Sequence, residues 1–420
     1  MINIGIVIGR IGGIDGVALE TEKWIEVLES IGHNIFVLAG ELEAELPHVS
    51  ILPELSFAHP RCMQDQSDAF FKQEVEEEEF LQRLNRDAAY IEEHIKNWLL
   101  QKKIDLLITQ NNIAIPCHLT MGMALKNIIE QEGIRTIAHN HDFYWERGER
   151  YKTKYSGLAR IIEDCFPANL PNIQHVVINS YNQGVLKEKL KVDACMVPNV
   201  MDFNKEFAQR DSFNSALPEE LGIRADEIAL FQITRIVERK SIETAIHLLS
   251  RLQDKKVKLF ITGSEKDDAY EYKAMLDSLI EKLKLKEQVF FVSERFSNVQ
   301  AIKEGKKIFS LADGYAHSRA ITYFSTYEGF GNGFLEAIVA KKPIFVNNFK
   351  PVYWPDIGSK GFKTVQLEDT ELTEEALAEM KAIIYDPEKC KEIGNFNFEL
   401  GKKYFSFEVL RQKLEALVNI

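Results

Sequence analysis

Two glutamates flank a glycine-rich turn in the second half of the chain. Glu328 comes just before Gly329, Gly331 and Gly333, and Glu336 lies on the amphipathic stretch that follows them. A glycine-rich turn that leads into a helix presents unpaired backbone N–H groups, which bind anions such as phosphate. Carboxylates beside such a turn accept hydrogen bonds from hydroxyl groups. Phosphates together with hydroxyls indicate a sugar nucleotide; the alternative is that the glycines form only a tight turn.

Two cations follow an earlier strand-like run of the same half. Arg235 and Lys240 come directly after the apolar run 228–234. They would stand at the carboxyl end of a parallel strand, where open α/β sheets bind ligands; the alternative is a pair of solvated surface charges. The sequence contains no Asp-x-Asp motif with which to hold a metal ion. We therefore expect chemistry that requires neither a metal nor another cofactor.

A polar cluster follows the short strand expected at 136–138 in the first half. His141 is its candidate ligand-binding histidine, although His139 competes for that role. Asp142 is either a functional acid or a helix N-cap, and Tyr144 either stacks on a sugar or packs in the core. Arg147 begins a basic run that is either a solvated loop or a site for an acceptor phosphate or carboxylate. The run continues with Arg150, Lys152 and Lys154.

The composition limits the class of protein. A chain of 420 residues is too long for one ordinary core, so two domains are expected. With 45% hydrophobic and 27% charged residues, it has the composition of a soluble globular protein. The net charge of −13 argues against a general nucleic-acid binder.

The cysteines and the apolar runs indicate the compartment. The five cysteines are scattered and form no C-x-x-C pair, which favours neither a disulfide framework nor a zinc site. No apolar run reaches the length that spans a bilayer, and the first one lacks the features of a signal peptide. We expect a cytoplasmic protein without stable membrane insertion, and no pattern indicates its oligomeric state.

Strand-like runs alternate with amphipathic stretches in both halves. In the first half, strands are expected at 2–8, 35–39, 104–109, 136–138, 176–179 and 192–197, with a glycine loop over 9–16 and mostly helix over 64–101. In the second half, strands are expected at 228–234, 257–262, 289–292, 321–324, 343–346 and 363–365. This alternation predicts an α/β protein with two Rossmann-like domains. We place them at 1–200 and 201–400, with a C-terminal helix within 401–420 that crosses back to the first domain.

These motifs resemble those of the retaining glycosyltransferases of the GT-B fold, in the family 4 group that uses nucleotide-activated sugars. The most specific match is Glu328 and Glu336, eight residues apart around Gly-Phe-Gly-Asn-Gly-Phe-Leu. The other matches are Arg235–Lys240, the Val-Pro-Asn-Val-Met-Asp segment at 197–202, and Gly12-Gly13. The resemblance covers most of the chain and implies two Rossmann-like domains that face each other across a cleft.

The resemblance also implies a role for each matched residue. Glu336 would bind the donor ribose, and Glu328 would contact the donor sugar near the reacting carbon. Arg235 and Lys240 would neutralise the diphosphate, and His141 would hold the transferred sugar from across the cleft. The backbones expected to cradle the sugar and phosphates are those of Gly13, Gly331, Asn332, Gly333 and Phe334.

Two departures from the family pattern bear on the substrate. Thr234 and Ser241 stand where the family often has glycines, which leaves the charges in place. The segment 141–147, His-Asp-Phe-Tyr-Trp-Glu-Arg, resembles members that act on small soluble acceptors such as glyceric-acid glycosides. We therefore expect retaining transfer of glucose or mannose from a UDP- or GDP-sugar to a small polar acceptor, either a glyceric-acid glycoside or a phosphorylated metabolite. Asp142, Tyr144 and Arg147 are the candidate acceptor contacts.

Three alternatives stay open at this point. In the first alternative, the protein is a glycosyltransferase whose acceptor is a polysaccharide or a lipid-linked sugar. In the second alternative, the protein is a glycoside phosphorylase or an NDP-sugar-forming synthase. In the third, it would bind a sugar nucleotide without catalysis; the presence of Arg235, Lys240, Glu328 and Glu336 argues against this last alternative.

The predicted use of fixed cations in place of a metal gives a direct test. Sugar transfer is expected to continue at an unchanged rate in excess EDTA, because Arg235 and Lys240 would supply the charge that a metal supplies elsewhere. The measurement is the initial rate with and without chelator. Loss of activity that manganese restores would contradict it.

Overall fold

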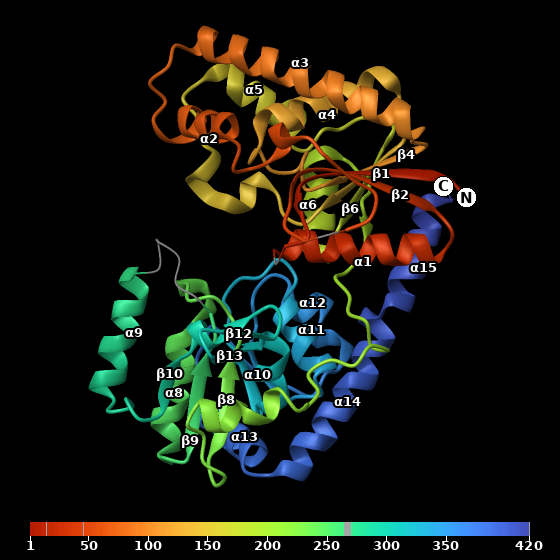
Figure 1. Ribbon diagram of the computed structural model, residues 1–420. Coiled ribbons are helices and arrows are strands. Elements are labelled where there is room, and N and C mark those ends of the chain that lie inside the picture. Colours follow the sequence, from red (N-terminus) through yellow and green to blue (C-terminus); the bar gives the residue numbers. More distant parts are fainter. Residues whose placement is uncertain (14, 45, 264–269, 420) are drawn as a thin grey trace. The chain divides into compact units, whose positions relative to one another are not determined.

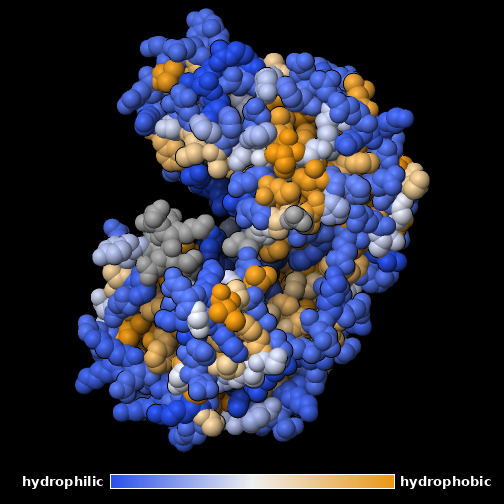
Figure 2. Space-filling model, viewed as in Figure 1, coloured by the Kyte–Doolittle hydropathy of each residue, from blue (hydrophilic) through white to orange (hydrophobic). Residues whose placement is uncertain are grey.

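The structure is a computed structural model that describes residues 1–13, 15–44, 46–263 and 270–419. The chain forms two compact units: unit 1 comprises Met1–Asn199 and Leu410–Ile420, and unit 2 comprises Val200–Val409. Hydrophilic residues cover most of the face shown in Figure 2, and hydrophobic residues form small separate patches. Among the described residues, no helix has both the length and the apolar content that crossing a bilayer requires.

Unit 1 is built on a seven-stranded sheet in the order β3-β2-β1-β4-β5-β6-β7 (Figure 1). Its strands are β1 Asn3–Ile11, β2 Asn34–Leu42, β3 Val49–Ile51, β4 Leu106–Gln110, β5 Thr136–Asn140, β6 Ile173–Val177 and β7 Cys195–Met196. All neighbouring strands are parallel. The strand order reverses between β1 and β4, and ligands of such sheets bind at the carboxyl ends of the strands there.

Helices cover both faces of this sheet. They are α1 Gly16–Ser30, α2 Pro60–Gln66, α3 Glu77–Lys102, α4 Leu119–Glu132, α5 Ser156–Cys165, α6 Ser180–Leu190 and, from Leu410 onward, α15 Phe407–Val418. α3, α4 and α5 pack together on one side (Figure 1). The C-terminal residues lie beside the N-terminal strand, where the Arg135 side chain donates to the Val418 carbonyl at 2.9 Å.

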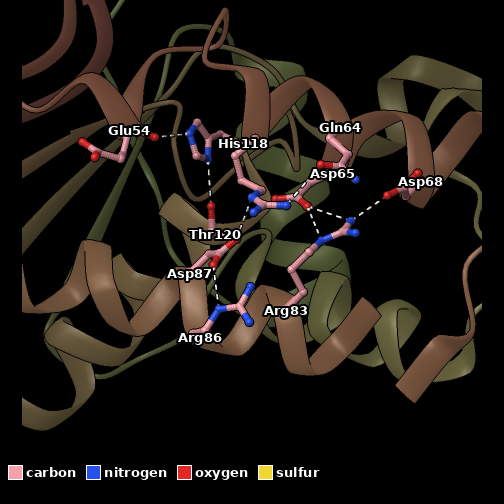
Figure 3. A network of polar contacts seen from close by, with 10 residues as sticks. Glu54, Gln64, Asp65, Asp68, Arg83, Arg86, Asp87, His118 and Thr120 are labelled. Carbon is pink, nitrogen blue, oxygen red and sulfur yellow. Dashed lines mark hydrogen bonds and ion pairs between the residues drawn. The ribbon is translucent and has the colours of Figure 1, made fainter. Parts of the chain in front are cut away.

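The helix expected over 64–101 is interrupted. A π-helical turn, Ser67–Phe71, continues from α2, and α3 begins only at Glu77, after Gln73 adopts a positive φ of 51°. Arg83 of α3 ties the two parts together, because its guanidinium binds Asp65 at 3.0 Å and Asp68 at 2.6 Å (Figure 3). Burial raises the pKa of Asp65 to about 6, although Arg83 opposes the shift.

The glycine loop expected from Gly9 begins later than predicted. β1 continues through Arg10 and Ile11, which pair with Glu41 and Leu42 of β2. Gly40 of β2 makes this extension possible, because it lets the neighbouring backbones approach closely. A Cβ on Gly40 would lie only 2.6 Å from the Gly9 carbonyl oxygen and 2.1 Å from the Ser56 nitrogen. The prediction treated Gly9 as a chain breaker, whereas here small size allows close approach of neighbouring backbones.

Unit 2 repeats the same topology with a parallel six-stranded sheet in the order β10-β9-β8-β14-β15-β16 (Figure 1). Its strands are β8 Ile228–Gln232, β9 Val257–Ile261, β10 Val289–Phe291, β14 Ala320–Tyr323, β15 Ile344–Asn347 and β16 Val365–Leu367. Its longer helices are α8 Ile242–Leu252, α9 Tyr270–Lys282, α10 Leu311–His317, α11 Asn332–Val339, α13 Glu374–Ile384 and α14 Pro387–Phe405. The strand order reverses between β8 and β14.

No element was predicted from the sequence for residues 296–317. They form a small three-stranded sheet, β11 Phe296–Ser297, β13 Lys306–Ser310 and β12 Ala301–Lys303, followed by α10. The strands are two to five residues long and rich in lysine, so they lack the apolar runs on which the prediction depended. α10 begins with a capping box between Ser310 and Asp313.

α11 is held in place by glycines of α14. A Cβ on Gly394 would lie only 2.0 Å from the carbonyl oxygen of Lys341, just after α11. A Cβ on Gly401 would meet Ile338 of α11 at 2.6 Å. α11 carries Glu336, so this close helix packing supports a candidate site residue.

Replacing Gly394 with alanine is therefore expected to lower the stability of unit 2. Overpacking typically costs ~1–3 kcal/mol, and here the clash is with backbone, which cannot rotate away. Gly184 of α6 is the matched control, since nothing lies within 4 Å of its Cβ position. Gly184→Ala should raise stability by about 0.5–1 kcal/mol. Thermal unfolding of both variants checks this, and equal melting temperatures would contradict it.

Candidate active site

The loops after β8 and β14 of unit 2 bring opposite charges together. Lys240 follows β8 and its ammonium forms an ion pair with Glu328, which follows β14. Their side chains are only 9% and 11% exposed. Because β8 and β14 are neighbours at the reversal of strand order, their following loops meet at one edge of the sheet.

Arg239 is a third member of this cluster, and the sequence analysis did not single it out. Its Nη1 donates to the second oxygen of Glu328 at 3.1 Å and to the Tyr327 carbonyl at 2.9 Å. Its own carbonyl accepts from the Thr326 backbone N–H at 2.8 Å. Arg239 therefore joins the two loops by both its side chain and its backbone.

The charges of this cluster support one another. Burial by itself would raise the pKa of Glu328, but Lys240 and Arg239 outweigh burial and hold that pKa below its ordinary value. Burial lowers the pKa of Lys240, and the nearby charges of Arg239 and Arg235 add to this effect while Glu328 opposes it. Glu328 is therefore ionised and paired at neutral pH.

Arg235 occupies a different environment. Its side chain is exposed, and it forms no ion pair with any described residue, in contrast to Lys240. The backbone of its loop packs closely on Gly263. A Cβ on Gly263 would lie 1.9 Å from the Thr234 carbonyl oxygen and 2.6 Å from the Arg235 Cα. Arg235 thus offers an uncompensated positive charge at the end of β8.

Two buried tyrosines line the same edge. Tyr315 of α10 donates from its hydroxyl to Glu336 at 2.8 Å, and the Tyr323 ring lies 5.2 Å from the Lys240 ammonium. Burial raises the pKa of both hydroxyls well above the ordinary value, and the neighbouring carboxylates Glu336 and Glu328 add to the shift. Both hydroxyls therefore stay protonated and can donate hydrogen bonds to those carboxylates.

The glycine turn of unit 2 depends on its lack of side chains. Gly331 has φ 114° and ψ 58°, a left-handed conformation that favours glycine, and it precedes α11 without a side-chain cap. Gly333 lies against Tyr323, whose ring atom would be 2.8 Å from a Cβ. Asn332 and Phe334 form the first turn of α11, where backbone N–H groups carry partial positive charge.

In unit 1, the histidines lie at the carboxyl end of β5. His139 is 1% exposed and stacks on Trp24 with ring centroids 4.1 Å apart, whereas His141 is 7% exposed and lies one residue beyond the strand. The Gln110 amide oxygen lies 3.0 Å from Nδ1 of His139 and 3.3 Å from Nε2 of His141. Burial lowers the pKa of His141 to about 4, with Asp15 opposing, so this ring is neutral at pH 7.

Asp142 is a side-chain partner and not the helix N-cap that was considered as an alternative. The 3₁₀ segment Tyr144–Tyr151 has Phe143 at its N-cap position. Asp142 instead accepts a hydrogen bond from Asn111 at 2.8 Å and forms an ion pair with Arg147. Tyr144 is half-buried and its ring lies 5.2 Å from that of Trp145, so it takes part in packing.

The glycine loop after β1 is enclosed by the turn after β2. Gly12 has φ 79°, and a Cβ on it would lie 2.6 Å from the Ala44 nitrogen. A Cβ on Gly13 would lie 2.6 Å from the carboxylate of Glu43. Gly12 therefore excludes larger residues, because its neighbour is backbone, whereas the end of the Glu43 side chain could move away from a larger residue at Gly13. Asp15 then caps α1 by accepting from the Val17 and Ala18 N–H groups at 3.0 and 3.1 Å.

The structure thus brings Lys240 and Glu328 into contact, places Glu336 on the helix after the glycine turn, and leaves Arg235 exposed. In unit 1, it brings Asp142 and Arg147 together. Within the part of the chain that the structure describes, no three His, Cys, Asp or Glu residues are grouped so as to hold a metal ion.

Comparisons with known proteins identify the family and the fold. Residues 214–399 match the family described as Glycosyl transferases group 1. The chain is 31% identical to the mannosylglucosylglycerate synthase of Petrotoga mobilis, over 97% of this chain and 99% of that protein. It is also 31% identical to the mannosylglucosylglycerate synthase of Thermotoga maritima, over 99% of both chains.

Solved structures share the fold. The sucrose-phosphate synthase of Thermosynechococcus elongatus superposes with a TM-score of 0.67 at 15% identity, covering 100% of this chain and 98% of that one. HepE of Anabaena, in complex with UDP-glucose, superposes with a TM-score of 0.67 at 13% identity, covering 100% of both chains. These likenesses confirm the predicted GT-B architecture of Rossmann-like domains. Together with the full-length relatives, they show that this chain belongs to the group 1 glycosyltransferases, the family 4 group that its motifs predicted.

Proposed function

We propose that this protein transfers a hexose from a nucleoside diphosphate sugar to a hydroxyl of a glyceric-acid glycoside, with retention and without a metal ion. The observation that carries this proposal is the 31% identity to two mannosylglucosylglycerate synthases along almost the whole chain. Their name describes a product that contains a mannosyl group, a glucosyl group and glycerate. Mannose as the transferred sugar and glucosylglycerate as the acceptor are therefore the substrates to test first.

The charges of the unit 2 cluster suit a diphosphate leaving group. Arg235, Arg239 and Lys240 contribute three positive charges and Glu328 one negative charge, which leaves a net charge of +2. A nucleoside diphosphate gains negative charge as the bond to the anomeric carbon breaks, and preorganised cations stabilise that charge. In this proposal, Arg235 and Lys240 bind the diphosphate, and the first turn of α11 adds its N–H groups.

Arg239 has a separate task in this proposal. When Lys240 turns one of its three N–H donors toward phosphate, its hold on Glu328 weakens. A buried carboxylate that loses its partner is strongly destabilising. Arg239 keeps Glu328 paired during this exchange, since it binds the oxygen that Lys240 does not.

The remaining donor contacts follow from the family pattern. Glu336 would accept hydrogen bonds from the ribose hydroxyls, with its orientation fixed by the Tyr315 hydroxyl at 2.8 Å. Glu328 would face the donor sugar. Because two cations hold Glu328, it is a weak nucleophile, and we favour a front-face reaction. The acceptor oxygen then bonds to the anomeric carbon as the carbon–phosphate oxygen bond breaks, and its proton passes to the departing phosphate.

The direct test is a donor and acceptor panel. We expect turnover of glucosylglycerate with one of UDP-, GDP- or ADP-mannose or the matching glucose donors, and a product with the anomeric configuration of the donor by NMR. Glu336→Gln should raise the donor KM. Inverted product would overturn the retaining assignment, and transfer only to lipid-linked or polymeric acceptors would overturn the acceptor. Ligand-induced thermal stabilisation without turnover would indicate a silent binding protein.

Arg239→Gln tests the role of the third cation. The expected loss in kcat/KM for the donor is about 10- to 100-fold, the equivalent of ~1.5–3 kcal/mol for a hydrogen bond to a charged group. Arg239→Lys should recover part of it. Arg251 is the matched control, because it is similarly exposed and likewise pairs with a glutamate, Glu374, and a backbone carbonyl. Equal activities of Arg239→Gln and Arg251→Gln would refute the role.

A further inference from the structure

A second cationic site lies in unit 1, at the carboxyl edge of its sheet. The segment after β5 carries Arg147 and Arg150, and the segment after the neighbouring β4 carries Cys117. Because parallel neighbours end at the same edge, the two segments converge there. Both guanidinium groups lie close enough to influence the same two side chains, since the charges of Arg147 and Arg150 each oppose the burial that raises the pKa of Cys117 and Tyr151.

The charges of this segment are unequally compensated. Arg147 is paired with Asp142, and Lys152 is paired with Glu149 at 2.7 Å. Arg150 has no carboxylate partner among the described residues. Arg150 is therefore an exposed cation that no carboxylate holds within the described part of a protein whose net charge is −13.

The Arg150 side chain lies near two aromatic rings. Its guanidinium carbon lies 5.5 Å from the ring centroids of both Phe71 and Tyr151. Gly148, with φ 56° and ψ −124°, breaks the 3₁₀ segment between Arg147 and Arg150 in a conformation that favours glycine. A planar guanidinium held in this way is preorganised to bind two oxygens of one anion.

The segment that carries Phe71 is fixed by contacts of its own. Phe71 ends the π-helical turn that Arg83 fixes through Asp65 and Asp68 (Figure 3). The chain after it is tied to the segment after Arg150, because the Tyr155 hydroxyl donates to the Val75 carbonyl at 2.7 Å. The contacts of Arg83 with Asp65 and Asp68 thus anchor the segment that carries Phe71.

We propose that Arg150, together with Arg147, recognises the carboxylate of the acceptor. This inference rests on the proposed function, which makes the acceptor a glyceric-acid glycoside, and it adds the residues that distinguish the acid from a neutral glycoside. Arg147 shares one N–H group with Asp142 and retains further donors, and its side chain is 49% exposed. A planar carboxylate matches the fork of Arg150, whereas a glycerol glycoside presents no charge to it.

The test compares glucosylglycerate with glucosylglycerol, the same glycoside without its carboxylate. In the wild type, kcat/KM should favour the acid. Arg150→Gln should reduce this preference about 10- to 100-fold, mainly through the acceptor KM, and Arg150→Lys should reduce it less because the charge remains. Lys154 is the matched control: it is an exposed cation four residues away, 5.3 Å from a tyrosine ring centroid, and Lys154→Gln should leave the preference unchanged.

Direct binding separates this inference from the proposed function. Calorimetric titration with glycerate should give binding that Arg150→Gln abolishes and Lys154→Gln does not. Such binding without turnover of glucosylglycerate would leave the site standing and overturn the proposed function. Turnover whose acid preference survives Arg150→Gln would overturn the site alone. An acceptor that bears a phosphate ester provides the last comparison. If Arg150→Gln lowers kcat/KM for this acceptor more than for glucosylglycerate, the site recognises a phosphate, and the carboxylate assignment is overturned.

Discussion

The ion pair between Lys240 and Glu328 is the interaction on which the candidate donor site depends. Both side chains are almost fully buried, so neither charge is tolerable without the other. Arg239 binds the remaining oxygen of Glu328, and the cluster keeps net positive charge for a ligand. A buried pair of this kind adds little stability by itself. In the proposed function, its value is that it fixes the direction of the carboxylate that faces the donor sugar and of the ammonium that binds phosphate before any substrate arrives.

Topology explains why these residues meet although they are 88 positions apart. Both units place two adjacent parallel strands at a reversal of strand order, and the loops after those strands share one edge. In unit 2, these loops carry Lys240 and Glu328. In unit 1, Asp142 and Asn111 follow β5 and β4, an adjacent parallel pair one strand beyond the reversal between β1 and β4, and their side chains hydrogen-bond at 2.8 Å. The same sheet geometry therefore brings polar side chains together in each unit.

Much of this was accessible from the sequence, and the misses have physical causes. Apolar runs identified most central strands, and the spacing of Glu328 and Glu336 around glycines identified the turn. The choice of Arg239 over Arg235 as the partner of Glu328 was not accessible, because it depends on the path of a loop pressed against Gly263. His139 and His141 could not be separated either, since they are the same residue type only two positions apart in the sequence. Burial against Trp24 distinguishes them.

The arginine clusters of the two units, around Arg235 in unit 2 and around Arg150 in unit 1, meet the same electrostatic constraint. A chain of net charge −13 repels anions at long range, so an anionic ligand is held only where positive charge locally exceeds negative charge. In unit 2, Arg235, Arg239 and Lys240 outnumber Glu328, and in unit 1 Arg150 is the cation without a carboxylate partner among the described residues. In each unit, a carboxylate also fixes the direction of a neighbouring cation, since Glu328 holds Lys240 and Asp142 holds Arg147. In the proposals made above, the carboxylate therefore sets the geometry of a cation that still has donors for the ligand, and the unpaired arginine adds attraction.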